Sequence, residues 1–260
     1  MILSALISPL FYSAVIINLA AVLAMAAPSS AHNTHRADIP VNYGMVLFPG
    51  FQALDVFGPL DILNTLSFTY PIHLSLIAST LDPVTTRTTR SSPGSNFSES
   101  VVPTHTFANP PKDLEVLFVP GGLGTRAPEP ALLDVIAYIK ETYPSLRYIV
   151  SVCTGATLLA RAGILDGKRA TTNKKAWGEV TPLGPNVKWV PVARWVEDGN
   201  IWTSSGVSAG IDATFAWVSA VYGEAVAADA ANGLEYERHT DPSWDPFAAI
   251  WGVPGSSSSS

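Results

Sequence analysis

The sequence LRYIVSVCTGATLLARAG, residues 146–163, decides the fold that this chain is expected to adopt. It opens with the apolar run Tyr148-Ile149-Val150, which is typical of a short buried strand. Its later apolar residues follow the spacing of one helix face: Ala156, Leu158, Leu159 and Ala162. Only residues 151–155 remain for the turn. A strand that turns this sharply into a helix lifts one side chain and points helix amides at it, which is the geometry of a nucleophile elbow.

Cys153 stands at this turn and is the only cysteine among the 260 residues. A thiol at a helix N-terminus is expected to be partly ionised, because the positive end of the helix dipole favours the thiolate. The flanking Gly155 and the small Ala156 favour such a reactive cysteine. The alternative is a structural cysteine packed behind a sheet, a common environment for a free cysteine.

Apolar runs and helical patterns alternate along the rest of the chain. Strands are expected at 45–48, 72–77, 115–119 and 148–150, with short ones near 187–190, 194–196 and 201–203. Helices are expected at 54–66, 129–142, 156–162, 210–222 and 224–236. Residues 81–111, rich in Thr, Ser and Pro, should hold at most short hairpin strands. This alternation predicts an α/β fold of three layers, a mainly parallel sheet with helices on both faces.

Three of the predicted strands are followed by candidate functional residues. Pro49-Gly50 leads to Asp55, the run from Pro120 to Gly124 is rich in glycine, and the third strand ends at Cys153. In open parallel sheets, ligands bind beyond the carboxyl ends of the strands. We therefore expect these three segments to meet in one crevice.

The composition limits the partners of the chain. A formal net charge of −6, without any run of Lys and Arg, argues against a nucleic-acid partner. One cysteine can form neither an internal disulfide nor a thiolate zinc cluster, and the five histidines lack the spacing of metal ligands. We expect a small-molecule substrate, with no metal and no cofactor.

The termini are expected to lie outside the folded domain. Residues 2–26 are almost wholly apolar and small residues follow, so residues 1–31 are expected to form a secretory signal peptide cleaved near Ala26 or Ala31, on a secreted protein. The alternative is an uncleaved membrane anchor, because the run is long enough to span a bilayer. Residues 32–42 are expected to be a linker, 43–250 the domain, and 251–260, ending in five serines, a disordered tail.

Five segments resemble the ThiJ/PfpI superfamily, relatives of the class I glutamine amidotransferases, and its isonitrile hydratase branch in particular. They are FPGFQALDVFGP at 48–59, VPGG at 119–122, SVCTGA at 151–156, LDGKRATT at 165–172 and SSGVSAGID at 204–212. The resemblance covers about residues 43–247. It implies a flavodoxin-like sandwich that forms homodimers.

The same resemblance implies a set of site residues. Cys153, Asp55 and Thr154 would be catalytic, and the oxyanion loop and pocket would be formed by Gly121, Gly122, Gly155, Gly206 and Val207. Protease-like members carry His directly after the nucleophile, where this chain has Thr154, and deglycase-like members use Glu where it has Asp55. Asn173 stands where some relatives carry His. These departures favour the hydratase branch over a Cys-His peptidase.

The implied reaction is hydration of an isocyanide to an N-substituted formamide through a covalent thioimidate on Cys153. Asp55 would shuttle the proton, and the Thr154 hydroxyl and the amides of Gly122 and Thr154 would hold developing charge. Asp55 could instead be only a helix-start residue placed by the helix dipole. Two other functions stay open: a glyoxalase or deglycase acting on 2-oxoaldehydes, and a non-catalytic redox sensor or chaperone in which Cys153 is oxidised.

Overall fold

The computed structural model describes residues 39–88 and 93–256. The chain divides into two units, Met1–Ile39 and Pro40–Ser260, and the sheet, its helices and the candidate site lie in the second. The expected signal peptide and most of the expected linker lie outside the described residues. Within 39–88 and 93–256, no helix is long and apolar enough to cross a bilayer.

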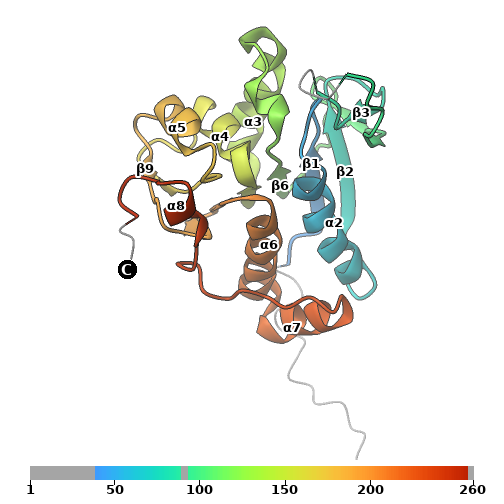
Figure 1. Cartoon of the computed structure of the whole chain (residues 1–260). Helices are drawn as coiled ribbons and strands as arrows, with labels where there is room; N and C mark the ends of the chain where they lie inside the picture. Colours follow the sequence, from blue (N-terminus) through green and yellow to red (C-terminus); the bar gives the residue numbers. More distant parts are fainter. Residues whose placement is uncertain (1–38, 89–92, 257–260) are drawn as a thin grey trace, which may run out of the picture. The chain divides into compact units, whose positions relative to one another are not determined.

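A seven-stranded sheet organises the folded unit (Figure 1). Its strands are β1 (Asn42–Val46), β2 (His73–Ala78), β5 (His105–Thr106), β6 (Val116–Val119), β7 (Tyr148–Ser151), β10 (Trp195–Asp198) and β11 (Ile201–Ser204). Their order is β10-β11-β7-β6-β1-β2-β5, and every neighbouring pair is parallel except β10 with β11. All four residues of β6 are apolar and buried, as expected for a central parallel strand covered on both faces.

Helices cover both faces of this sheet. The chain runs from β1 through α2 (Ala53–Ser67) to β2 in one direction along the sheet, and from β6 through α3 (Leu133–Thr142) to β7 in the opposite direction. Because such crossovers are right-handed, α2 and α3 lie on opposite faces. α6 (Val207–Tyr222) and α7 (Glu224–Gly233) pack with α2, and α4 (Ala156–Arg161) packs with α3. The predicted flavodoxin-like α/β sandwich is confirmed.

The reversal of direction places a topological switch point between β1 and β6. The loops that leave neighbouring strands diverge there, and a crevice opens at the carboxyl ends of the strands. The loop after β1 leads into α2, whose first turn holds Asp55, and the chain after β6 and β7 holds Gly121 and Cys153. The fold therefore brings the three predicted segments to one edge of the sheet.

The irregular regions hold smaller elements. As expected, a short antiparallel pair lies within 81–111, formed by β3 (Val84–Thr85) and β4 (Ser100–Val101). β8 (Arg169–Ala170) and β9 (Lys188–Trp189) form a separate parallel pair, so the strand expected near 187–190 does not join the main sheet. The helix expected from residue 129 begins at Leu133, because Glu129–Ala131 form a separate 3-10 turn that contains a proline. α5 (Trp177–Val180) was not predicted.

The C-terminal segment is packed further than expected. α8 (Phe247–Ile250) is followed by Val253, which is buried, and the Ser256 hydroxyl reaches the carbonyls of Ala248 and Val253 at 3.2 and 2.6 Å. The prediction of a disordered tail from Trp251 is therefore wrong for residues 251–256. One apolar side chain anchors the segment, and a serine hydroxyl can satisfy local carbonyls instead of water. Residues 257–260 lie outside the described part of the chain.

Candidate active site

Backbone hydrogen bonds join the loop after β1 to the loop after β6. The Gln52 amide donates to the Gly121 carbonyl at 2.9 Å, and the Gly124 amide donates to the Gly50 carbonyl at 2.9 Å. Gly50 has a φ of 78°, and a Cβ there would lie 3.0 Å from the Gly124 nitrogen, so both backbone conformation and space favour glycine. These bonds fix the start of α2 against the end of β6.

Asp55 lies in the first turn of α2 and is fully buried. Its Oδ2 accepts a hydrogen bond from the Gly121 amide at 2.9 Å. Its Oδ1 is also buried and has no oxygen or nitrogen partner among the described residues. The carboxyl is therefore held by one oxygen while the other remains available for the thiol.

Cys153 has the backbone geometry of a nucleophile elbow. Its φ is 59°, in the left-handed region that non-glycine residues rarely adopt and that clusters at functional sites. Cys153–Gly155 form a 3-10 turn that leads directly into α4. A Cβ on Gly155 would lie 2.4 Å from the Val119 carbonyl, so only glycine lets the turn approach β6 this closely. The predicted turn from strand to helix is confirmed.

Thr154 joins the elbow to the glycine loop. Its Oγ1 accepts a hydrogen bond from the Gly122 amide at 2.9 Å and another from the Thr125 hydroxyl at 3.1 Å. A Cβ on Gly121 would lie 2.5 Å from the Thr154 nitrogen, which explains the glycine. The Gly122 amide was predicted to hold developing charge, but here it is already donated to the Thr154 hydroxyl. The amide of Thr154 itself faces the Cys153 sulfur.

Asn173 is a site residue that the sequence did not reveal. Its Nδ2 donates to the Cys153 Sγ at 3.2 Å, and its Oδ1 accepts the Ala176 amide at 3.1 Å, which fixes the orientation of the side-chain amide. The Thr172 hydroxyl donates to the Cys153 carbonyl at 2.9 Å. In the sequence Asn173 was notable only for not being histidine. The sequence carried no signal for this contact, because Asn173 lies four residues before α5 begins at Trp177 and reaches the thiol only through space.

Gly206 and Val207 border the site at the start of α6. A Cβ on Gly206 would lie 3.5 Å from the Asn173 Nδ2, so this glycine adjoins the residue that contacts the thiol. Val207 is the first residue of α6 and is half-buried. The end of β11 therefore supplies a further wall, beside the loop that carries Asn173.

Burial controls the proton affinities of the pair. Burial raises the pKa of Asp55 to about 7, against the opposing effect of hydrogen bonds from the Gly121 amide and the Cys153 thiol. Burial also raises the pKa of Cys153 to about 12, and the negative charge of Asp55 adds to this rise. The Thr154 amide and the Asn173 and Thr154 side chains oppose the rise by donating to the sulfur.

The prediction of a thiol partly ionised by the helix dipole is therefore wrong. Cys153 is only 6% exposed, and loss of water disfavours the thiolate more than the donors favour it. The neighbouring carboxyl has its pKa near neutrality, so at neutral pH it can accept or donate a proton beside the thiol. Within 39–88 and 93–256, no group of three or more His, Cys, Asp or Glu side chains could hold a metal ion.

Comparison with known proteins shows which family the chain belongs to. A sequence profile described as the DJ-1/PfpI family matches residues 44–220, and the chain belongs to that family. The predicted resemblance to ThiJ/PfpI proteins is thereby confirmed.

The similar proteins differ in activity. The chain is 38% identical to an isonitrile hydratase of Pseudomonas putida over 172 residues, which are 65% of this chain and 67% of the relative. It is 32% identical to a deglycase of Pyrococcus horikoshii over 110 residues, 42% of this chain and 60% of the relative. A solved ThiJ/PfpI family protein from Pseudomonas syringae is 30% identical, with a TM-score of 0.67 over 85% of each chain. The family is therefore established, whereas its members named here include both hydratase and deglycase.

Proposed function

We propose that this protein hydrates an isocyanide to an N-substituted formamide. The observation that carries the proposal is the buried Asp55 carboxyl beside the Cys153 thiol, with a pKa near neutrality and one oxygen that has no oxygen or nitrogen partner in the described part of the chain. A group with such a pKa can both give and take a proton at neutral pH. The similarity to an isonitrile hydratase, and Thr154 in place of a histidine after the nucleophile, support the same reaction.

The first half of the proposed reaction forms a covalent adduct. Asp55 takes the proton of the Cys153 thiol, and the sulfur forms a bond to the terminal carbon of the isocyanide. The same proton then passes from Asp55 to that carbon, which leaves a thioimidate with a carbon–nitrogen double bond. The Thr154 amide and the Asn173 side chain, both directed at the sulfur, stabilise the thiolate as it forms.

The second half consumes one water. Asp55, again a carboxylate, takes a proton from water as the oxygen bonds to the thioimidate carbon, and this proton passes to the nitrogen. The carbon–sulfur bond then breaks, the hydroxyl proton returns to the sulfur through Asp55, and an N-substituted formamide leaves. Water and the isocyanide are the only reactants, and the thiol is regenerated.

Product analysis tests this proposal. The purified protein is incubated with cyclohexyl isocyanide, and N-cyclohexylformamide is measured by mass spectrometry. We expect formamide with the wild-type protein and none above background with Cys153→Ala. Parallel incubation with methylglyoxal tests a glyoxalase or deglycase, the activity suggested by the similarity to a deglycase. Consumption of methylglyoxal without formamide production would replace the hydratase by that alternative.

Assembly and location are separate proposals. We propose a secreted homodimer, because the family resemblance implies a dimer and the apolar residues 2–26 resemble a signal peptide. Light scattering of the purified protein measures the mass, and N-terminal sequencing of the secreted product measures the cleavage site. A monomer mass would contradict the homodimer. An intact N-terminus in a membrane fraction would contradict the cleaved signal peptide.

A further inference from the structure

A buried ion pair lies next to the candidate active site. Lys174 Nζ and Asp245 Oδ2 are 3.3 Å apart, and each side chain is only 1% exposed. The ammonium also donates to the Thr171 hydroxyl and to the Thr172 carbonyl and lies over the Trp177 ring. The desolvation of two buried charges offsets much of their attraction, so such a pair contributes little to stability for its own sake. It does fix the geometry of the groups around it.

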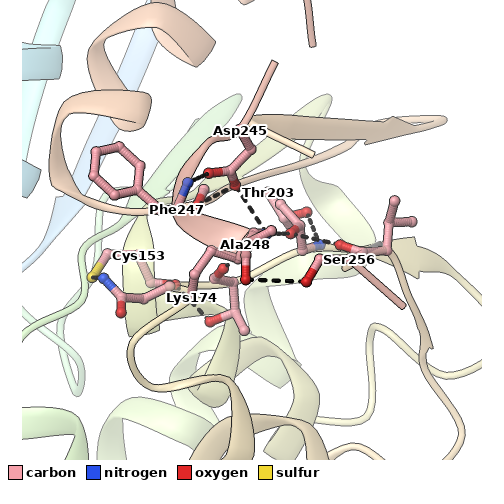
Figure 2. A network of polar contacts seen from close by, with 12 residues as sticks. Cys153, Lys174, Thr203, Asp245, Phe247, Ala248 and Ser256 are labelled. Atoms are coloured by element: carbon pink, nitrogen blue, oxygen red, sulfur yellow. Dashed lines mark hydrogen bonds and ion pairs between the residues drawn. The ribbon is translucent and has the colours of Figure 1, made fainter. Parts of the chain in front are cut away.

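Asp245 connects three segments that are distant in sequence. Its Oδ2 accepts a hydrogen bond from the Ser205 hydroxyl at 2.9 Å, besides pairing with Lys174. Its Oδ1 accepts the Phe247 amide at 3.1 Å, at the start of α8 (Figure 2). One carboxylate therefore joins the C-terminal segment, residues 242–256, to the loop after β8 and to the end of β11.

Both partners of Asp245 adjoin residues of the thiol site. Lys174 directly follows Asn173, which donates to the Cys153 sulfur at 3.2 Å. Ser205 directly precedes Gly206, whose Cβ position would lie 3.5 Å from the same Asn173 amide. The Thr171 amide donates to the Thr203 hydroxyl of β11 at 2.9 Å, which ties the base of this loop to the sheet. A shift of Lys174 or Ser205 would therefore move the hydrogen-bond donor of the thiol.

We propose that Asp245 is a positioning residue for the thiol: through Lys174 and Ser205, the C-terminal segment holds Asn173 in hydrogen-bonding contact with Cys153. Asp245 lies beyond residues 44–220, the part that matches the family profile. The C-terminal segment is thus a working part of the thiol site, although the hydrogen-bond and ion-pair partners of Asp245 are Lys174, Ser205 and Phe247 and not the thiol. This inference concerns the reactivity of Cys153 and is independent of which substrate the protein accepts.

The test measures the alkylation rate of Cys153 by iodoacetamide between pH 6 and 10. Because Cys153 is the only cysteine, the rate reports on this thiol alone. Asn173→Ala removes the donor itself and should slow alkylation about tenfold to hundredfold at a given pH, the effect of one hydrogen bond to a charged group. Asp245→Asn should slow it about threefold to tenfold, because the donor is present but no longer held.

A double-mutant cycle separates positioning from an unrelated effect. If Asp245 acts through Asn173, then Asp245→Asn should slow alkylation no further in a protein that already carries Asn173→Ala. Multiplicative effects of the two substitutions would contradict this route.

Glu115→Gln is the control, since it breaks an ion pair, that of Arg147 with Glu115, before the start of β6 and away from the thiol and the C-terminal segment. It should lower the melting temperature and leave the alkylation profile unchanged. An equal slowing in this control would mean that any loss of stability affects the thiol, and would overturn the proposal.

A folded Asp245→Asn protein with the wild-type alkylation profile also overturns it. If Asp245→Asn does not fold, Lys174→Met/Asp245→Leu replaces the pair by apolar side chains of similar size, a change that folded proteins often tolerate. The same slowing is expected there, and a wild-type profile would again refute positioning by Asp245. Formamide production plays no part in these measurements, so the proposed function and this inference can fail separately.

Discussion

At the scale of single residues, the candidate site depends on two neighbouring buried groups, the Cys153 thiol and the Asp55 carboxyl. Burial raises the pKa of both Cys153 and Asp55, and the negative charge of Asp55 raises the pKa of Cys153 further. Hydrogen bonds from Gly121 to the carboxyl, and from Thr154 and Asn173 to the sulfur, offset part of this rise. Near pH 7 the Asp55 carboxyl is therefore about half ionised while the Cys153 thiol keeps its proton, so a substrate that reaches the thiol meets it beside a group that can take or give a proton.

Asp55→Asn should change turnover and thiol reactivity in opposite directions. The amide cannot exchange a proton, so formamide production should fall about a hundredfold to ten-thousandfold, the range for a positioned acid or base. Loss of the neighbouring negative charge lowers the pKa of Cys153, so iodoacetamide should label the thiol faster than in the wild-type protein. Both are measured on the same preparation. Wild-type turnover in this variant would make Asp55 only a helix-start residue.

The raised pKa of Asp55 also predicts how stability depends on pH. The folded-state pKa of about 7 lies above that of an ordinary aspartate, so between about pH 4 and 7 the folded protein binds more protons than the unfolded chain. The contribution of this group to stability is therefore fully present at low pH and is lost as the pH rises through 7. Asp55→Asn lacks this loss.

Urea unfolding of both proteins at pH 5, 6, 7 and 7.5 measures the difference. As the pH rises across this window, the free energy of unfolding of the variant should increase relative to that of the wild type by about 1 kcal/mol per pH unit. The thiol of Cys153, with a pKa far above the window, does not contribute to the difference. A difference that stays constant from pH 5 to 7.5 would show that the Asp55 pKa is not raised.

At the scale of elements, the site is assembled from loops that approach closer than side chains would allow. Gly121 faces Thr154 and Asp55, Gly155 faces the Val119 carbonyl, and Gly122 faces the backbone of Gln52. Each contact joins the end of one strand to the turn that follows another. The glycines therefore set the distances between catalytic groups. They do so because they lack a Cβ and let the loops approach closely, not because they donate hydrogen bonds to the substrate.

Gly121→Ala should disturb this assembly. The added Cβ would lie 2.5 Å from the Thr154 nitrogen and 3.0 Å from the Asp55 Oδ2, and backbone cannot yield as a flexible side chain does. We expect a loss of about 1–3 kcal/mol in the free energy of unfolding and about a hundredfold loss of turnover from misplaced groups.

Gly178→Ala, in α5, is the matched control. A Cβ there meets nothing within 4 Å, so stability and turnover should stay near the wild-type values. Chemical denaturation and formamide production measure both variants. Equal turnover in the two would show that the Gly121 loop tolerates the shift.

At the scale of the folded unit of Pro40–Ser260, α6 supports the sheet beneath the site. Trp217 is fully buried, and its ring meets those of Tyr43 in β1, Phe118 in β6 and Tyr148 in β7 at centroid distances of 5.7 to 6.1 Å. These are the three strands whose ends carry Asp55, Gly121 and Cys153. One indole therefore packs against every strand that positions the candidate catalytic groups.

Trp217→Ala should cost about 3–5 kcal/mol of unfolding free energy, because it leaves a large cavity under the three strands. Trp217→Phe should cost less than half as much: the ring remains, and the indole nitrogen that it removes has no hydrogen-bond partner among the described residues. Thermal and urea unfolding measure both. Equal losses from the two substitutions would mean that the indole nitrogen, not the packing, stabilises the fold.

The sequence alone determined the parts of this protein that depend on local pattern. The run Tyr148-Ile149-Val150 followed by helical spacing predicted the elbow, and the alternation of strands and helices predicted the sandwich and the convergence of Asp55 with Cys153. These predictions hold because backbone geometry and strand direction follow from neighbouring residues and from the right-handed crossover.

Only the tertiary structure decided the properties that depend on contacts between distant segments. Surrounding segments exclude water from the thiol and thereby raise its pKa, an effect that a helix-dipole argument does not include. The Gly122 amide is already donated to Thr154, and Asn173 reaches the sulfur from a loop after β8. Asp245 is joined to Lys174 across 71 positions of sequence, the difference between their residue numbers. No local pattern encodes such pairs, because burial and through-space hydrogen bonds exist only once the whole sheet and its loops are assembled.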